Sequence, residues 1–285
     1  MTDPASGNDT WNPWRVAPDS GFETRGPNGR VGLIQKDDKN FVVTDEFRFS
    51  QPAVEKDIVS RLRKDGKSPE EAQRAYDDAR TFTPTEENPT DMASIPPFMR
   101  WFENSYGKHT LAAIIHDELI VDGPNTGALG SDTLADRFFR KMMQSAGVPW
   151  LKRWIMWAAV AMRSRWAAEG VTRLKLIAWG VVAVVGIAAF VNAVGAAFLD
   201  WGHLVDPWWL LGIAVALPFA SAVLWGKQYG ASFVAAAAAL WILPAAIFAA
   251  LGYGAYQILE GLAKFIGWSR GKIRRRRRPH DAPSR

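Results

Sequence analysis

The sequence predicts an α+β fold, in which a small antiparallel sheet with helices is followed by a C-terminal bundle of two or three transmembrane helices. Three observations lead to this prediction. Short apolar clusters alternate with turn residues between residues 31 and 49, amphipathic helical patterns run from 110 to 166, and long uncharged apolar stretches begin at residue 176. Nearly all charge lies before Lys175 or after Leu259, so the two parts of the chain suit different solvents.

These patterns divide the chain into four segments. Residues 1–24 are expected to form a flexible N-terminal arm, and residues 1–10 lack the basic and apolar regions of a signal peptide. Residues 25–167 predict a soluble domain, and residues 168–259 a transmembrane region. Residues 260–285 form a basic tail.

The sheet is expected early in the soluble domain. Apolar clusters within residues 31–49 are separated by the turn residues 37–40, which predicts paired strands. A charge-rich segment at about 52–80 follows and predicts an exposed helical insertion, with Ser68 as helix cap and Pro69 at the first helical position. Residues 81–89 are expected to be extended.

Three further helices are expected in the second half of the domain. Thr110 suits the start of a helix that runs to Val121 with an apolar stripe. Ser131 suits the start of a second helix, which Gly147 and Pro149 end. A third, at 150–166, holds four tryptophans and four basic residues, so it could pack on the domain or lie at a membrane surface.

Three blocks of residues carry a resemblance to a known family. They are Thr90-Asp91-x-Ala93-Ser94-Ile95-Pro96, Ala112-Ala113-Ile114-Ile115-His116-Asp117, and Ala135-Asp136-x-x-Phe139 with Gly147-Val148-Pro149. In order and spacing they resemble the DUF1353 family, a domain of unknown function found in phages and bacteria. The resemblance covers about residues 25–167 and does not extend to the apolar segments. The family has no settled activity, so the resemblance implies candidate positions and no reaction.

The sequence departs from this family in two places. Glu87-Asn88-Pro89 stands where a glycine and a phenylalanine are expected before the Thr-Asp pair, and the helical segment at about 52–80 is extra.

The resemblance implies a set of polar site positions. His116, Asp117 and Asp91 are the candidate catalytic residues, with Ser94 and Asp136 in support, because Asp and His carry out acid–base chemistry. The same three residues are the candidate ligands of a divalent metal, which is the one cofactor considered. His116 and Asp117 point about 100° apart on a helix, so they suit the edge of a cleft better than a single ion.

A structural network is the competing interpretation of these positions. Asp91 and Ser94 suit caps for the turn at Pro96, and His116 would then donate to Asp91. Asp136 would pair with Arg137 or Arg140.

Composition limits the chemistry that is open to the chain. There is no cysteine among the 285 residues, which excludes disulfides, thiolate catalysis and cysteine-ligated zinc. The net charge of +5 comes from the tail, where five arginines are consecutive. Beside an apolar helix such a run predicts binding of anionic lipid headgroups, and no motif for reading nucleic acid accompanies it. The arginines are Arg274, Arg275, Arg276, Arg277 and Arg278.

Three apolar runs predict membrane crossings, at residues 176–199, 208–225 and 231–251. Basic residues before the first run place the soluble domain in the cytoplasm. Three full crossings would then export the arginine tail, against the same rule. Either the short second run or the third run, which contains Pro244, crosses only partly, or the tail is exported.

The functional prediction is a multi-pass inner-membrane protein with a cytoplasmic DUF1353-like domain, acting as a phage- or prophage-related accessory or envelope-acting factor. Its expected partners are membrane lipid and either another protein or a second copy of this chain. One alternative is a membrane-tethered hydrolase that uses the His-Asp positions with a divalent metal. Another is a holin-like protein that permeabilises the membrane.

Overall fold

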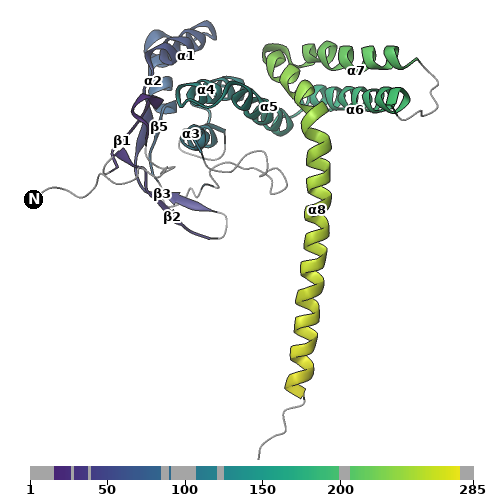
Figure 1. Ribbon diagram of the computed structural model, residues 1–285. Coiled ribbons are helices and arrows are strands. Elements are labelled where there is room, and N and C mark those ends of the chain that lie inside the picture. The colour runs from purple at the N-terminus through teal and green to yellow at the C-terminus, as the bar shows by residue number, and fades with distance from the viewer. Residues whose placement is uncertain are drawn as a thin grey trace, which may run out of the picture.

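The computed structural model describes residues 16–26, 29–37, 40–84, 90, 107–120, 125–198 and 206–276 (Figure 1). It is an α+β structure in which most elements are helices, which confirms the predicted fold class of the soluble part.

Within the described residues, five short strands form two antiparallel sheets. The first has the order β1 (Phe22–Thr24), β4 (Phe47–Phe49) and β5 (Thr81–Phe82), and the second pairs β2 (Leu33–Gln35) with β3 (Phe41–Val43). The paired strands expected within residues 31–49 are therefore split, because β4 pairs with β1 and β5 and not with β3.

Aromatic packing accounts for the partners of β4. Phe47 and Phe49 both point into the core, as their alternation with Arg48 dictates. The Phe49 ring lies 5.1 Å from that of Phe22 on β1, and the Phe47 ring lies 5.1 Å from that of Phe82 on β5. Each partner strand thus contributes an aromatic ring to the same buried face.

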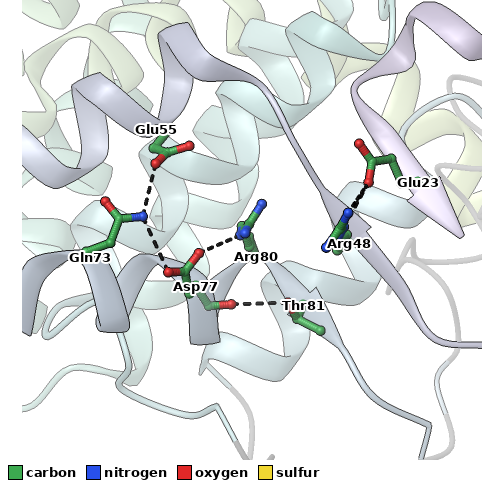
Figure 2. A network of polar contacts seen from close by, with 7 residues as sticks. All are labelled: Glu23, Arg48, Glu55, Gln73, Asp77, Arg80 and Thr81. Carbon is green, nitrogen blue, oxygen red and sulfur yellow. Dashed lines mark hydrogen bonds and ion pairs between the residues drawn. The ribbon is translucent and has the colours of Figure 1, made fainter.

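The strand β1 belongs to the segment predicted as a flexible arm. Phe22 lies in the core, and on the outer face Arg48 donates to Glu23 across the strand pair at 2.8 Å (Figure 2). The last residues of that segment are therefore part of the sheet. Residues 1–15 lie outside the described residues.

Helices α1 (Pro52–Lys64) and α2 (Pro69–Ala79) follow β4. The predicted start of α2 is confirmed, since Ser68 Oγ accepts from the Glu71 amide and the Glu71 carboxylate accepts from the Ser68 amide. The expectation that this segment is exposed is wrong. Ile58, Leu62 and Tyr76 are fully buried, because small and apolar residues recur every three or four positions among the charged ones.

A polar network on the outer side of these helices ties α1 and α2 to β5 (Figure 2). Gln73 donates to Glu55 of α1 at 3.0 Å and to Asp77 at 3.4 Å. Arg80 donates to the Asp77 carboxylate at 2.8 Å, and the Thr81 hydroxyl donates to the Asp77 carbonyl at 3.1 Å. The turn from α2 into β5 is thereby held against both helices.

The three helices expected next are confirmed as α3 (Thr110–Ile120), α4 (Asp132–Ser145) and α5 (Trp150–Ala167). Phe138 of α4 is central to the core and packs edge-on against Phe49 at 5.7 Å and Tyr76 at 5.8 Å. It therefore joins the sheet, α2 and α4 in one hydrophobic core.

In the apolar part of the chain, residues 171–198 and 206–276 form three helices and one 3-10 segment. They are α6 (Val171–Phe198), α7 (Pro207–Ser221), η4 (Ala222–Gln228) and α8 (Tyr229–Arg276). The run predicted at 208–225 is divided between α7 and η4, while the run at 231–251 lies within α8, which continues past Pro244. Gly226, with φ 55 and ψ −120, lets the chain bend between α7 and α8.

The arrangement of these helices is visible in Figure 1. Helices α6 and α7 lie side by side as an antiparallel hairpin, and α8 runs at a steep angle to both. Two stretches in this part are long and apolar enough to cross a membrane, Val171–Phe198 with mean hydropathy 2.3 and Pro207–Ala239 with 1.8.

Candidate functional site

A buried carboxylate lies where the soluble domain meets the apolar helices. Asp136 of α4 is 0% exposed, and three side chains from different elements bind it. His116 Nε2 of α3 lies 2.9 Å from Oδ1, Ser164 Oγ of α5 donates to Oδ1 at 3.1 Å, and Gln228 Nε2 donates to Oδ2 at 2.8 Å. His116 is the donor of its hydrogen bond to the carboxylate when the imidazole ring carries a proton on Nε2.

The local sequence explains why these polar groups are buried. Asp136 shares the inward face of α4 with Phe139, and the Phe139 ring lies 4.8 Å from the His116 ring. His116 belongs to the buried face of α3, beside Ile115 and Leu119. A buried polar group without partners is costly, so the cluster is stable only when its members satisfy each other.

The cluster extends to the start of the apolar helices through Arg165. Its Nε donates to Gln228 Oε1 at 2.9 Å, and its Nη2 donates to the Trp225 carbonyl of η4. The guanidinium also lies 4.9 Å from the centre of the Trp225 ring. Burial lowers the pKa of Arg165, and the charge of Asp136 opposes that shift.

A cleft of about 450 Å³ opens beside this cluster. Its walls come from the first turn of α4, the end of α5, the start of α6, and η4. Desolvation raises the pKa of Asp132 at this cleft, the Asp136 carboxylate raises it further, and His116 opposes the shift. The polar residues that line it are Asp132, Thr133, Ser164, Arg165, Thr172 and Lys175, with Gln228 at its base.

The structure brings together two of the five predicted site residues, His116 and Asp136. Asp117 is half-buried and points toward Arg163, with 3.9 Å between its Oδ1 and the Arg163 Nη1. Asp91 and Ser94 lie outside the described residues, and so does any contact of His116 with Asp91. The catalytic role of these residues remains a prediction.

The expected partners of Asp136 were wrong. Arg137 instead forms two hydrogen bonds with Asp57 of α1, at 2.9 and 3.2 Å. Arg140 instead lies between two indole rings of α5, with its guanidinium 4.2 Å from the ring of Trp154 and 4.3 Å from that of Trp157. Both arginines are partly buried, whereas Asp136 is fully buried.

The geometry can be tested against the predicted divalent metal. Among the described residues, no group of three or more His, Asp or Glu side chains is arranged to hold an ion. Asp91 is one of the three predicted ligands and lies outside those residues, so the metal site remains a prediction. The predicted lipid-binding arginines Arg274–Arg276 end α8, and Arg277 and Arg278 lie outside the described residues.

Sequence analysis missed Ser164, Arg165 and Gln228. Ser164 stands on the same face as Trp157 and Ala161 in an otherwise apolar-and-basic helix, which is the one signal that a polar contact is needed there. Gln228 stands between two apolar runs and reads as an ordinary loop residue. Its role follows only from the fold, because 92 residues separate it from Asp136.

Comparison with known proteins supports the family resemblance. Residues 70–160 match the family model described as "Protein of unknown function (DUF1353)". The match includes nearly all of α2, which belongs to the segment interpreted above as an insertion, together with His116 and Asp136. Ser164, Arg165 and Gln228 lie outside it. No curated protein and no solved structure matches the chain.

Proposed function

Starting from a DUF1353 segment joined to apolar helices, we propose that this protein is anchored in the inner membrane and holds that segment at the cytoplasmic face, as an accessory factor of phage or prophage origin that acts on the cell envelope. The observation that carries the proposal is the continuous apolar surface that α6 and α7 expose. The phage origin rests on the family resemblance alone.

The exposed surface of the hairpin is unsuited to water. Val184 is 64% exposed and Phe198 80% exposed, and large apolar side chains lie on several sides of α6. Each would gain about 1.5–3 kcal/mol from leaving water, so a bilayer stabilises this surface strongly. The exposed residues are Leu174, Ile177, Val181, Val184, Val185, Val191, Val194 and Phe198 on α6, and Trp208, Trp209, Ile213, Val215 and Phe219 on α7.

The two ends of the hairpin match the two surfaces of a membrane. Helix α6 has 28 residues, which corresponds to a length of about 42 Å, against about 30 Å for the hydrocarbon core. Trp166 is exposed just before its first turn, close to Arg173, whose Nε donates to the Trp166 carbonyl at 2.8 Å. Trp208 and Trp209 are exposed at the opposite end, and tryptophan favours both interfaces.

The polar cluster supports a hairpin topology. Gln228 reaches Asp136 after α7, so the chain returns to the domain from which α6 departed. The domain and η4 then lie on one side of the membrane and the connection between α6 and α7 on the other. This agrees with basic residues before α6 and Lys227 after α7, since both flanks belong in the cytoplasm.

The steep angle of α8 to the hairpin supports a tail on the cytoplasmic side (Figure 1). If the hairpin follows the membrane normal, α8 runs along the membrane. Its exposed residues between Phe248 and Leu259 are largely apolar, so this part of α8 must lie partly within the hydrocarbon core, at its boundary with the headgroups. The third apolar run is then the one that does not cross, which removes the conflict with the arginine tail.

The buried cluster favours an accessory role over the hydrolase alternative. His116 is 5% exposed, and three side chains already form hydrogen bonds with the carboxylate beside it. A general base needs access to a substrate proton, and these contacts leave none to this pair. The holin-like alternative is also less favoured, because the hairpin is held to the soluble domain through Arg165 and Gln228.

The absence of cysteine makes a clean topology test possible. Single cysteines at Asp206→Cys and Lys227→Cys in the full-length chain should react with a membrane-impermeant maleimide from opposite sides. A reporter fused after Arg285 should be active in the cytoplasm. Release of the full chain from membranes by alkaline carbonate would contradict the anchor. An exported reporter with a carbonate-resistant chain would contradict only the placement of α8.

A further inference from the structure

We propose that the cleft between α4, α5, α6 and η4 binds the headgroup of a phospholipid that carries both a phosphate and a primary ammonium, as phosphatidylethanolamine does. The phosphate lies at Arg165 and Lys175 and the ammonium at Asp132. This inference rests on the membrane anchoring proposed above, and it adds a ligand to that anchor.

The cleft has the size of a ligand site. Its volume of about 450 Å³ falls within the usual range of about 300–1,000 Å³ for small-molecule pockets. Four separate elements form its walls, and the hydrogen bonds of Arg165 to Gln228 and Trp225 join two of them. The base of the cleft is thus a defined arrangement of side chains.

The charges in the cleft suit a phosphate. Two of the three guanidinium nitrogens of Arg165 bind the protein, and Nη1 forms no hydrogen bond within the described part of the chain. Lys175 is exposed on the cleft wall and has no ion-pair partner among the described residues. Arginine and lysine are common phosphate ligands, and Thr172 lines the same cleft.

The cleft also contains one acid, which favours a ligand with a cation. Asp132 lines the cleft without an ion pair among the described residues, and the Asp136 carboxylate lies near enough to raise its pKa. A primary ammonium beside Asp132 would offset that repulsion by donating hydrogen bonds. A quaternary ammonium cannot donate them, and a glycerol headgroup brings no charge.

The position of the cleft indicates a lipid as the source of this headgroup. Lys175 lies directly before Leu176, where the apolar run of α6 begins, so the cleft lies at the expected headgroup level. Leu224 and Trp225 add apolar walls on the side of the hairpin. A ligand with a polar head and an attached acyl chain can contact both the polar and the apolar walls of the cleft.

Two variants test the assignment without disturbing the cluster that holds the cleft together. Asp132→Asn and Lys175→Gln change exposed side chains, whereas Arg165 is left intact because it binds Gln228 and Trp225. Arg173→Gln is the matched control, since Arg173 is an exposed cation on the same turn of α6 that does not line the cleft.

The experiment uses detergent-purified full-length protein with equimolar phosphatidylethanolamine, phosphatidylglycerol and phosphatidylcholine, and native mass spectrometry counts the retained lipid. The wild-type chain should retain phosphatidylethanolamine about tenfold better than the others, as expected for the loss of one charge-assisted hydrogen bond. Asp132→Asn should abolish this preference. Lys175→Gln should weaken retention of all three lipids several-fold, and Arg173→Gln should change nothing.

Several outcomes would overturn the assignment. The first is equal retention of the three lipids by the wild-type chain, and the second is an unchanged preference for phosphatidylethanolamine in Asp132→Asn. The third is an equal loss of retained lipid in Lys175→Gln and Arg173→Gln. Displacement of the lipid by an equal concentration of soluble glycerophosphoethanolamine would show that the acyl chain is irrelevant and would overturn the lipid source. Carbonate extraction of the same variants separates this result from a failure of the anchor itself.

Discussion

The soluble core and the α6–α7 hairpin are both rich in apolar residues, yet they place them in opposite ways. Phe138 and Ile58 are fully buried between helices and sheet, whereas Val184 and Phe198 of α6 are largely exposed. The core residues alternate with charged ones at helical spacing, and the hairpin has almost no charge to alternate with. Apolar content therefore does not define a protein core. An apolar segment packs into the core of a soluble domain when the same helix also has a polar face.

The two regions also use polar side chains differently. In the soluble domain most ion pairs lie at the surface, as between Arg48 and Glu23, and such pairs contribute little. At the junction with the hairpin, Asp136 is fully buried and joins α3, α4, α5 and η4. Directional hydrogen bonds in a buried site specify one orientation of the hairpin relative to the soluble domain. Nondirectional apolar packing alone does not provide this.

The largest expected effect comes from a core truncation. Phe138→Ala should lower the free energy of unfolding by about 3–5 kcal/mol, because it leaves a cavity between Phe49 and Tyr76. Thermal unfolding of the full chain in detergent measures this. Val184→Ala on α6 is the control and should leave the transition unchanged. Equal losses in the two variants would mean that the α6 surface is a core after all.

A charge in the middle of α6 sharpens the contrast between the regions. Val184→Arg should oppose membrane insertion by about 2.5–3.5 kcal/mol, since arginine at the centre of a spanning helix is costly. The fraction of the full chain that resists carbonate extraction should fall. On a water-exposed helix the same substitution is nearly neutral, so an unchanged fraction would remove the distinction between α6 and a soluble helix. Val171→Arg, at the first residue of α6, is the matched control and should be tolerated.

Removing the buried carboxylate tests the junction. Asp136→Ala should destabilise the full chain by about 2–3 kcal/mol, because it leaves His116, Ser164 and Gln228 without their acceptor. A double-mutant cycle with Gln228→Ala, followed by thermal unfolding, should show coupling between the two positions. Strict additivity would indicate that the contact between Asp136 and Gln228 does not form in the membrane.

The Asp57–Arg137 pair makes a smaller contribution that depends on pH. Burial opposes ionisation of Asp57, but the hydrogen bonds and charge of Arg137 outweigh it and lower its pKa. A lowered pKa in the folded state stabilises the protein above the unfolded pKa of about 3.9, and this stabilisation is lost as pH falls below it. Asp57→Asn should cost about 0.5–1 kcal/mol at pH 7, after allowance for solvent screening, and less at pH 2. Unfolding midpoints at the two pH values measure the difference.

Asp132 should show the smallest effect, with the opposite sign. Its pKa is raised in the folded state, so the folded state prefers the protonated carboxyl, and stability falls as pH rises through that pKa. Asp132→Asn should therefore raise stability at pH 7 by a few tenths of a kcal/mol, and should have no effect at pH 2. A lower midpoint at pH 7 would show that Asp132 has a stabilising partner.

The candidate site was predictable only in part. His116 and Asp136 could be chosen from the sequence because the blocks that contain them resemble a family. Their mutual contact could not, since it depends on how α3 and α4 pack. The segment at 52–80 was expected to be exposed because it is rich in charge, although three buried positions in α1 and four in α2 are enough to bind it to the core.

What the sequence determined by itself is local or compositional. The capping box at Ser68, the bounds of α3 to α5 and the apolar character of α6 follow from residues within a few turns of each other, because helix caps and periodicity are short-range. Only the tertiary structure decided that β4 pairs with β1 and β5, that Asp136 binds Gln228, and that a cleft opens at the base of the hairpin. These contacts join residues 20 to 92 positions apart, and many alternative partners satisfy the same local chemistry.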